Sequence, residues 1–193
     1  PHFTYLSKKQ QYYLSKKDIQ GYVHVTKILA NEFSAAGDIL KSVQQCKAGL
    51  IVLKKYHFKR GEGMLFDGLT KNFLIIGDTV EALINLNKAI AVYVKAGDST
   101  EQAAGYRMLG AIYGLKSKAL YANSAINYLE KSKKINSLIK NDEGYFLSLI
   151  GLANLYTRYE EYGLALNFYN QALSFASEKS MKYEVALTYQ NIG

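Results

Sequence analysis

Four stretches of the chain repeat one arrangement of apolar, small and aromatic residues. A large apolar residue is followed by Leu and a small residue, then by an aromatic residue and a turn. After the turn, three small or apolar residues follow at spacings of four and three. Residues three and four positions apart share one face of an α-helix. Each stretch therefore predicts two helices that bury their apolar faces against each other.

The four copies are regularly spaced. Their first halves contain Thr26, Leu29-Ala30 and Phe33; Phe66, Leu69-Thr70 and Phe73; Tyr106, Leu109-Gly110 and Tyr113; and Leu149, Leu152-Ala153 and Tyr156. Their second halves contain Ser42, Cys46 and Gly49; Ala82, Leu86 and Ala89; Ala125, Leu129 and Ser132; and Ala165, Tyr169 and Ala172, the first of each set lying 40, 43 and 40 residues apart. In the third copy we expect a turn three residues longer. Tyr189 and Ile192-Gly193 match the beginning of a fifth copy.

Proline interrupts helices and occurs only at position 1. We therefore expect an all-α chain, with helices at 3–16, 19–36, 38–55, 61–76, 79–95, 99–115, 119–139, 143–158, 161–177 and 180–193. Helix pairs that leave apolar surface uncovered stack in arrays. The prediction is one repeat domain over residues 1–193, with copies at 22–58, 62–96, 99–140 and 143–179 and a truncated fifth copy at 180–193. Residues 1–18 are either an N-terminal cap or the end of an earlier repeat.

These residues resemble the tetratricopeptide (TPR) repeat, whose pattern is W-x2-L-G-x2-Y followed by A, F, A and P. The resemblance covers nearly the whole chain after residue 20. It departs from the family in its period of about 40 residues, in lacking Trp at the first position and in lacking the closing Pro. Longer, Pro-poor copies are similar to those of bacterial sensor kinases, peptide-pheromone receptors and kinesin light chains. The resemblance implies a right-handed α–α superhelix, a solenoid of antiparallel helix pairs.

The resemblance also implies a concave groove lined by the first helix of each pair. It places six polar residues there: Lys27, Asn31, Lys71, Arg107, Asn154 and Arg158. The other groove positions are His24, Ser34, Ala35, Met64, Asp67, Leu74, Ile75, Ala104, Ala111, Gly114, Leu115, Leu147, Ile150 and Thr157. Cations in this groove would suit an acidic peptide or a terminal carboxylate, and the Asn amides can bond both the N–H and the C=O of an extended peptide. The alternative is that these side chains only solvate an empty face.

One TPR clamp for C-terminal carboxylates begins with Lys and Asn, which Lys27 and Asn31 match. Its later members do not carry over, because Gly68, Ala104 and Met108 stand where Asn, Lys and Arg are needed. The sequence therefore argues against that particular clamp.

Charge and cysteine content bear on the possible partners of the chain and on its cellular location. Lys and Arg exceed Asp and Glu by 24 to 16, giving a net charge of +8. Such an excess can indicate binding to nucleic acid or to an acidic membrane surface. The lysines are spread in small groups, however, which is typical of solvated helix surfaces. No stretch approaches the roughly 20 apolar residues that span a bilayer, and no secretory h-region is present. A single cysteine favours a cytoplasmic location, with an upstream signal or membrane segment left open.

Motifs for catalysis or metal binding are missing from the sequence. His2, His24 and His57 lie far apart and form no zinc motif. Cys46 occupies an apolar repeat position and is expected to be an inert core thiol. No G-x-S-x-G or Walker-type loop occurs. We expect no enzyme activity, cofactor, metal or small-molecule substrate in this segment.

The sequence therefore predicts a protein- or peptide-binding scaffold. Because the chain begins without Met and ends within a repeat, we expect the sensory or interaction segment of a larger bacterial signalling protein, with an attached catalytic domain such as a histidine kinase left open. The alternatives are a peptide-pheromone-type regulatory receptor and, less favoured, a nucleic-acid-binding helical repeat. The half repeat leaves an apolar helix face open, through which a homodimer could form.

Overall fold

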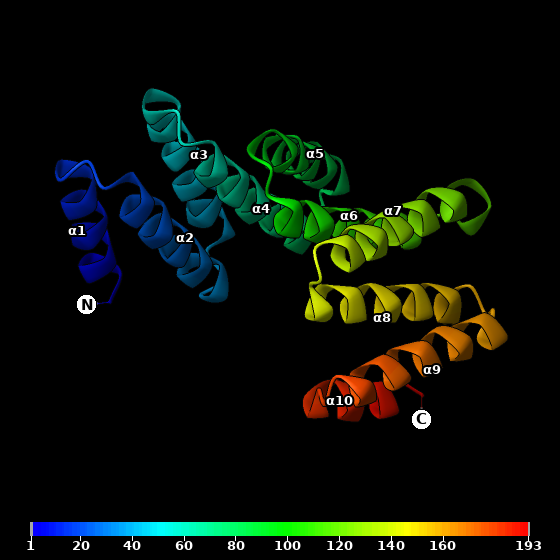
Figure 1. Ribbon diagram of the computed structural model, residues 1–193. Coiled ribbons are helices and arrows are strands. Elements are labelled where there is room, and N and C mark those ends of the chain that lie inside the picture. The colour runs from blue at the N-terminus through cyan, green and yellow to red at the C-terminus, as the bar shows by residue number, and fades with distance from the viewer. Residues whose placement is uncertain (1, 193) are drawn as a thin grey trace. The chain divides into compact units, whose positions relative to one another are not determined.

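The computed structural model describes residues 2–192, and across them the chain consists of ten α-helices without a strand (Figure 1). The helices are α1 (His2–Ser15), α2 (Ile19–Ala35), α3 (Ile39–Tyr56), α4 (Lys59–Ile75), α5 (Thr79–Ala96), α6 (Ser99–Gly114), α7 (Lys118–Leu138), α8 (Asp142–Arg158), α9 (Tyr162–Glu178) and α10 (Lys182–Ile192). Every bound lies within two residues of the expected one. The all-α prediction is confirmed. None of the helices within residues 2–192 combines the length and apolar character needed to cross a membrane.

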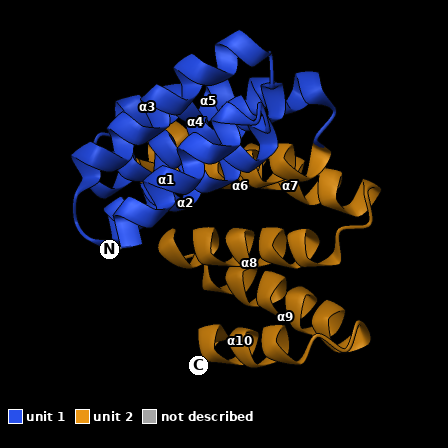
Figure 2. Cartoon of the chain, turned by 90° about the vertical axis from the view of Figure 1, so that its left-hand side faces the viewer, with its two compact units in different colours: residues 1–98 blue, residues 99–193 orange. Residues whose placement is uncertain are grey.

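The chain forms two compact units, residues 1–98 and residues 99–193 (Figure 2). The first contains α1 followed by the pairs α2–α3 and α4–α5, and the second contains the pairs α6–α7 and α8–α9 followed by α10. The helices of each pair pack against each other, and they coincide with the four sequence copies. The stacked aromatic rings of Phe3 and Phe33, whose centroids are 4.7 Å apart, join α1 to α2.

Glycine and aspartate together form the turns within the first two pairs. Gly37 and Gly77 have φ of 81° and 79°, a left-handed conformation that costs other residues energy because Cβ crowds the backbone. The next residue caps the following helix: the side chains of Asp38 and Asp78 accept hydrogen bonds from the backbone N–H three residues on. These turns reverse the chain sharply and bring the two helices side by side.

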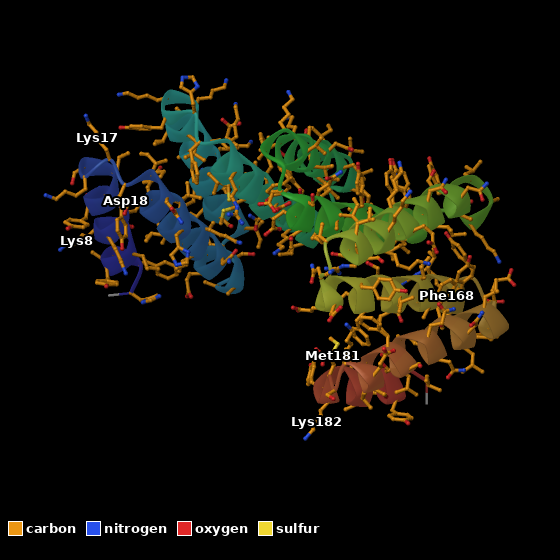
Figure 3. The ribbon with its side chains drawn as sticks, viewed as in Figure 1. Lys8, Lys17, Asp18, Phe168, Met181 and Lys182 are labelled. Carbon is orange, nitrogen blue, oxygen red and sulfur yellow. The ribbon has the colours of Figure 1, made fainter. Side chains whose placement is uncertain are left out.

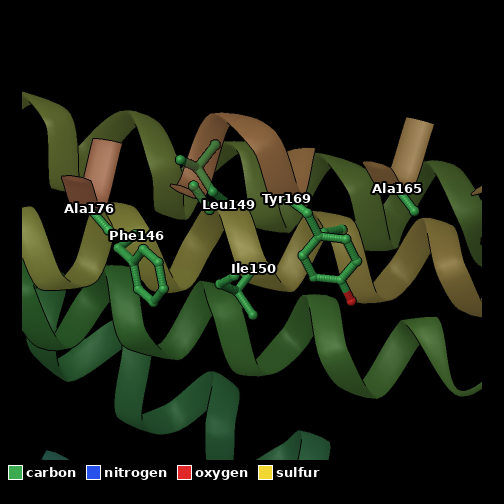
Figure 4. Close-up of a cluster of buried hydrophobic side chains, with 8 residues drawn as sticks. Phe146, Leu149, Ile150, Ala165, Tyr169 and Ala176 are labelled. Atoms are coloured by element: carbon green, nitrogen blue, oxygen red, sulfur yellow. The ribbon is translucent and has the colours of Figure 1, made fainter. Parts of the chain in front are cut away.

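The repeat residues form the core, as the pattern predicts. The second-half residues of all four copies are buried, with Ala82, Ala125 and Ala172 fully inaccessible to solvent. In the fourth copy, Phe146, Leu149 and Ile150 of α8 pack against Ala165, Tyr169 and Ala176 of α9 (Figure 4). Figure 3 marks Phe168 on α9. Its partly buried ring stacks on Tyr156 of α8 with centroids 5.5 Å apart. Small residues at these positions let two helices approach closely.

Polar side chains are buried at the joints between consecutive copies. Asn72 of α4 donates to the Ser42 hydroxyl of α3 at 2.8 Å, and that hydroxyl donates to the carbonyl of Ala30 in α2 at 2.7 Å. In the second unit, the hydroxyls of Ser132 on α7 and Ser148 on α8 lie 2.9 Å apart. All of these side chains are buried and hydrogen-bonded, so they add directional contacts to an otherwise apolar core.

The third copy departs from expectation at its turn. Its three extra residues do not lengthen the connection between α6 and α7, which covers only residues 115–117. They instead add a turn to the beginning of α7, so Ala125 is the eighth residue of its helix whereas Ala82 is the fourth of α5. Lys118-Ala119-Leu120 contains good helix formers and no glycine, so this segment propagates the helix towards Ser117.

The open end of α10 exposes residues whose equivalents are buried elsewhere. Ile192 is 39% exposed, whereas the corresponding Leu109 and Leu152 are at most 1% exposed. Tyr189 on the same helix is 61% exposed. A homodimer through this face stays a prediction.

Gly77 and Gly163 offer a matched pair of substitutions. Gly77→Ala should lower the free energy of unfolding by about 1 kcal/mol, because Ala must then adopt a positive φ. Gly163→Ala should instead raise it by roughly 0.5 kcal/mol, since its Cβ meets nothing within 4 Å and Ala favours the helix. Urea unfolding followed by circular dichroism measures both; destabilisation by both variants alike would contradict this account of the turn.

Candidate functional site

A cavity of about 330 Å³ opens in the second unit, between the first helices of the third and fourth copies. Its walls come from α6 and α8, and Leu129 of α7 completes the lining. The full lining is Arg107, Gly110, Ala111, Gly114, Leu115, Leu129, Leu147, Ile150, Gly151, Asn154, Leu155 and Arg158. Its interior is mainly apolar, and Arg107, Asn154 and Arg158 supply its polar side chains.

Glycines bring the helices close around this cavity. A Cβ on Gly110 would lie 2.6 Å from Cγ of Leu129, and one on Gly151 would lie 2.8 Å from Cδ2 of the same side chain. A Cβ on Gly114 would lie 2.5 Å from Cδ1 of Leu155. The missing Cβ atoms therefore let the two leucines reach the backbones of α6 and α8 and form an apolar wall.

Three of the six sequence-predicted residues meet at this cavity. Arg107 on α6 and Asn154 and Arg158 on α8 all line it. The groove positions Ala111, Gly114, Leu115, Leu147 and Ile150 line it as well. The repeat positions did not indicate Gly110, Leu129, Gly151 or Leu155, because their small or leucine side chains are also what core packing requires.

The other three predicted residues belong to the first unit. Lys27 and Asn31 lie on α2 and Lys71 lies on α4; Asn31 and Lys71 are exposed and Lys27 is half-buried. The six residues thus form two groups, one in each unit. Only the second group lines the cavity described above.

Arg107 is a half-buried cation without a direct counter-ion. Burial lowers the pKa of its guanidinium, an effect that the negative charge of Glu143 partly opposes. Within residues 2–192 the guanidinium makes no ion pair or hydrogen bond. An unpaired charge removed from water is costly, which is why most such charges in proteins have a partner. The cavity therefore favours an anionic group beside Arg107.

Two further recesses continue the cavity along the helices. One of about 180 Å³ shares Arg107 and Leu147 with it and reaches Asn141 and Glu143 at the beginning of α8. The other, open and polar, shares Arg158 with it and reaches Lys116 and Lys118. We call the three together the α6–α8 groove. Glu143 lines the first recess and Glu160 lines the second, and the positive charges of Arg107 and Arg158 lie in the cavity that both recesses adjoin.

Lys118 is already engaged in the second recess of the α6–α8 groove. Its Nζ donates to the backbone carbonyl of Tyr159 at 2.8 Å and to the carboxylate of Glu161 at 3.0 Å. Arg158, in contrast, is exposed and forms no ion pair with a carboxylate within residues 2–192. Arg107 and Arg158 are therefore the cations lining the cavity itself that remain available to a ligand.

Other candidates for chemistry find no support. Cys46 is 1% exposed, and burial raises the pKa of its thiol to about 12, so it is protonated and inaccessible at neutral pH. Within residues 2–192, no group of three or more His, Cys, Asp and Glu side chains is placed to hold a metal ion. The groove is accordingly the best-formed candidate site of the described chain.

Comparisons with known proteins identify the fold. No protein-family model matches the sequence, and neither does any curated protein. Among solved structures, BtubC (BKLC) from P. vanneervenii is similar with a TM-score of 0.68 and 13% identity, over 84% of this chain and 66% of that one. A Podosopora anserina protein described as a kinesin light chain with nearly identical TPR-like repeats has a TM-score of 0.65 and 17% identity, over 87% of this chain and 85% of that one. The MamA protein has a TM-score of 0.59 and 16% identity, over 93% and 94%.

This chain has the TPR-like helical repeat fold. The fold agrees with the repeat residues, which are buried where a TPR-like pair requires them. In TPR-like terms, α6 and α8 are the first helices of consecutive pairs, and the α6–α8 groove lies between them.

Arg107 should reduce the stability of the unliganded chain. Arg107→Met keeps a long side chain with similar helix propensity and removes the unpaired charge, so the free energy of unfolding should rise by about 1 kcal/mol. Arg158→Met is the control, since an exposed cation changes stability little. Thermal unfolding of the three proteins measures this; a lower midpoint for Arg107→Met than for wild type would show that the charge is compensated.

Cys46 should resist alkylation in the folded protein. Iodoacetamide at neutral pH should leave native chain unmodified, and unfolding in urea should expose one reactive thiol. Burial raises the pKa of the thiol from the ordinary value of 9.0 to about 12 in the folded chain. The stability that this difference contributes is therefore complete below pH 9 and is lost as pH rises towards 12. Mass spectrometry detects the adduct; rapid native labelling would contradict the burial of this thiol.

Proposed function

We propose that this chain is a protein- or peptide-binding scaffold and that the α6–α8 groove holds an extended acidic segment of its partner. The unpaired charge of Arg107 beside a preformed apolar cavity carries this proposal. A partner carboxylate would replace the water that the guanidinium loses on burial, and charge-assisted bonds to Arg are among the stronger ones in proteins. Arg158 of α8 supplies a second such contact in the same cavity.

The apolar part of the cavity suits a partner side chain. Its volume of about 330 Å³ is at the small end of the range of about 300–1,000 Å³ for ligand pockets. It is large enough for one bulky side chain, whereas a whole helix would need a longer apolar trough. An extended segment with an apolar residue close to an acidic one therefore combines the features that this groove offers.

The wider setting follows from the same proposal. As a binding module, the chain would serve as the sensory or interaction segment of a larger signalling protein in the cytoplasm. In the peptide-pheromone-type alternative, the ligand is a short free peptide, and its binding shifts the population of conformations that an attached domain reads. Both versions place the ligand in the α6–α8 groove.

Binding of labelled peptides tests the proposal. In one set of eight-residue peptides Asp and Glu alternate with apolar residues, and in matched sets Asn and Gln or Lys replace the acids. We expect fluorescence anisotropy to show binding of the acidic set alone. Arg107→Ala/Arg158→Ala should weaken that binding about tenfold or more, because both charge-assisted contacts are lost.

Lys134→Ala/Lys182→Ala is the matched control. It removes the same charge from exposed positions on α7 and α10 that do not line the cavity, so binding should persist. Equal weakening by both double variants would indicate non-specific attraction of polyanions by a chain of charge +8. In that event single-stranded DNA would compete, and its affinity would fall steeply with salt. Equal weakening by both double variants, or competition by single-stranded DNA, would exclude the groove as the binding site.

A further inference from the structure

The amide oxygen of Asn154 accepts a hydrogen bond from a residue outside the cavity. The hydroxyl of Tyr169 on α9 donates to Oδ1 of Asn154 on α8 at 2.5 Å. Tyr169 is 6% exposed and packs in the same cluster as Ile150, which also lines the cavity (Figure 4). The buried hydroxyl thus engages the oxygen end of an exposed amide and leaves its NH₂ end outside this bond.

This hydrogen bond belongs to the fourth copy alone. The repeat position of Tyr169 is occupied by Cys46, Leu86 and Leu129 in the other three copies. Packing explains an apolar residue or an aromatic ring at this buried position, but it does not require a hydroxyl. The hydroxyl therefore has a role that the repeat pattern leaves unexplained.

Fixing the amide changes the chemistry that the cavity presents. With Oδ1 turned towards Tyr169, Asn154 presents its Nδ2 amide hydrogens to a ligand, and these only donate. Arg107 and Arg158 also only donate. All three polar side chains lining the cavity are then hydrogen-bond donors. A carboxylate can satisfy three donors, whereas the NH₂ of a carboxamide meets no acceptor among them.

We propose that the cavity selects a carboxylate next to an apolar group over the carboxamide of the same shape, and that Tyr169 is the positioning residue for this selectivity. The inference rests on the proposed function and specifies its ligand. The apolar group occupies the space beside Leu129, Ile150 and Leu155, and the carboxylate lies against the donors. The carboxylate can be an Asp or Glu side chain or the end of a chain, since both have the same chemistry.

Two pairs of probes test the proposal and distinguish a side-chain carboxylate from one at the end of a chain. N-acetyl-leucine and N-acetyl-leucinamide compare a terminal carboxylate with its amide. Acetyl-Leu-Asp-amide and acetyl-Leu-Asn-amide make the same comparison within a chain. Each probe is titrated into the ¹⁵N-labelled chain, and the amide signals of Gly110, Gly114 and Gly151 report occupancy of the cavity. In at least one pair, the carboxylate should bind about tenfold more tightly than the amide.

Tyr169→Phe keeps the ring and removes the hydroxyl. The amide of Asn154 can then rotate and offer its oxygen to a ligand, so the ratio of acid to amide affinity should fall about threefold or more, mainly through better binding of the amide. Charge attraction alone predicts an unchanged ratio, because the variant removes no charge. Tyr145→Phe is the control, since this α8 tyrosine packs on Phe175 and does not line the cavity, and it should leave the ratio unchanged.

A second variant does not disturb the core. Asn154 is exposed, and Asn154→Asp replaces its donor by a carboxylate of the same shape, so the preference for acids should disappear. Equal affinity of wild type for acid and amide in both pairs would overturn the selectivity and leave peptide binding intact. An unchanged ratio in Tyr169→Phe would overturn the role of the hydroxyl, and an unchanged ratio in Asn154→Asp would overturn the role of the amide. Absence of any shift with all four probes would overturn the proposed ligand and the proposed function together.

Discussion

Close approach of two helix backbones at a small buried residue is the contact on which each pair of this chain depends. Ser42, Ala82, Ala125 and Ala165 each stand at this contact and are at most 3% exposed. Because a helix pair cannot cover its own outer apolar face, it must pack on the next pair, and stability is shared between neighbours. The groove follows from this arrangement, since the first helices of stacked pairs necessarily lie side by side.

The α6–α8 groove contains residues that lower the stability of the free chain, and the surrounding core makes them tolerable. Leu129 and Leu155 reach the backbone of the opposing helices only because Gly110, Gly114 and Gly151 lack a Cβ. Those glycines weaken their helices, and the half-buried charge of Arg107 adds a desolvation cost. The surrounding core offsets both. Features that lower the stability of a free protein are typical of places where a partner supplies the missing contact.

The sequence was sufficient to predict the helices and their pairing, but it could not predict the hydrogen bonds and charges of the groove. Spacings of three and four, together with the near absence of proline, identified every helix to within two residues. Repeat positions placed Arg107, Asn154 and Arg158 on one face, and the fold brings them to one cavity. The same positions could not separate Lys27, Asn31 and Lys71 into another unit. They also could not reveal the bond from Tyr169, because a buried tyrosine at a packing position looks like any other core aromatic.

The buried Asn72–Ser42 hydrogen bond has a consequence for the order of the copies. Asn72 belongs to the second copy and its acceptor belongs to the first, so the bond forms only when these two are neighbours. The equivalent positions in the third and fourth copies are Ile112 and Leu155, which have no amide to donate. Shuffling or duplicating a copy by recombination would therefore leave a buried amide without its acceptor. The copies are therefore not interchangeable at this joint, because Asn72 of the second copy is matched to Ser42 of the first.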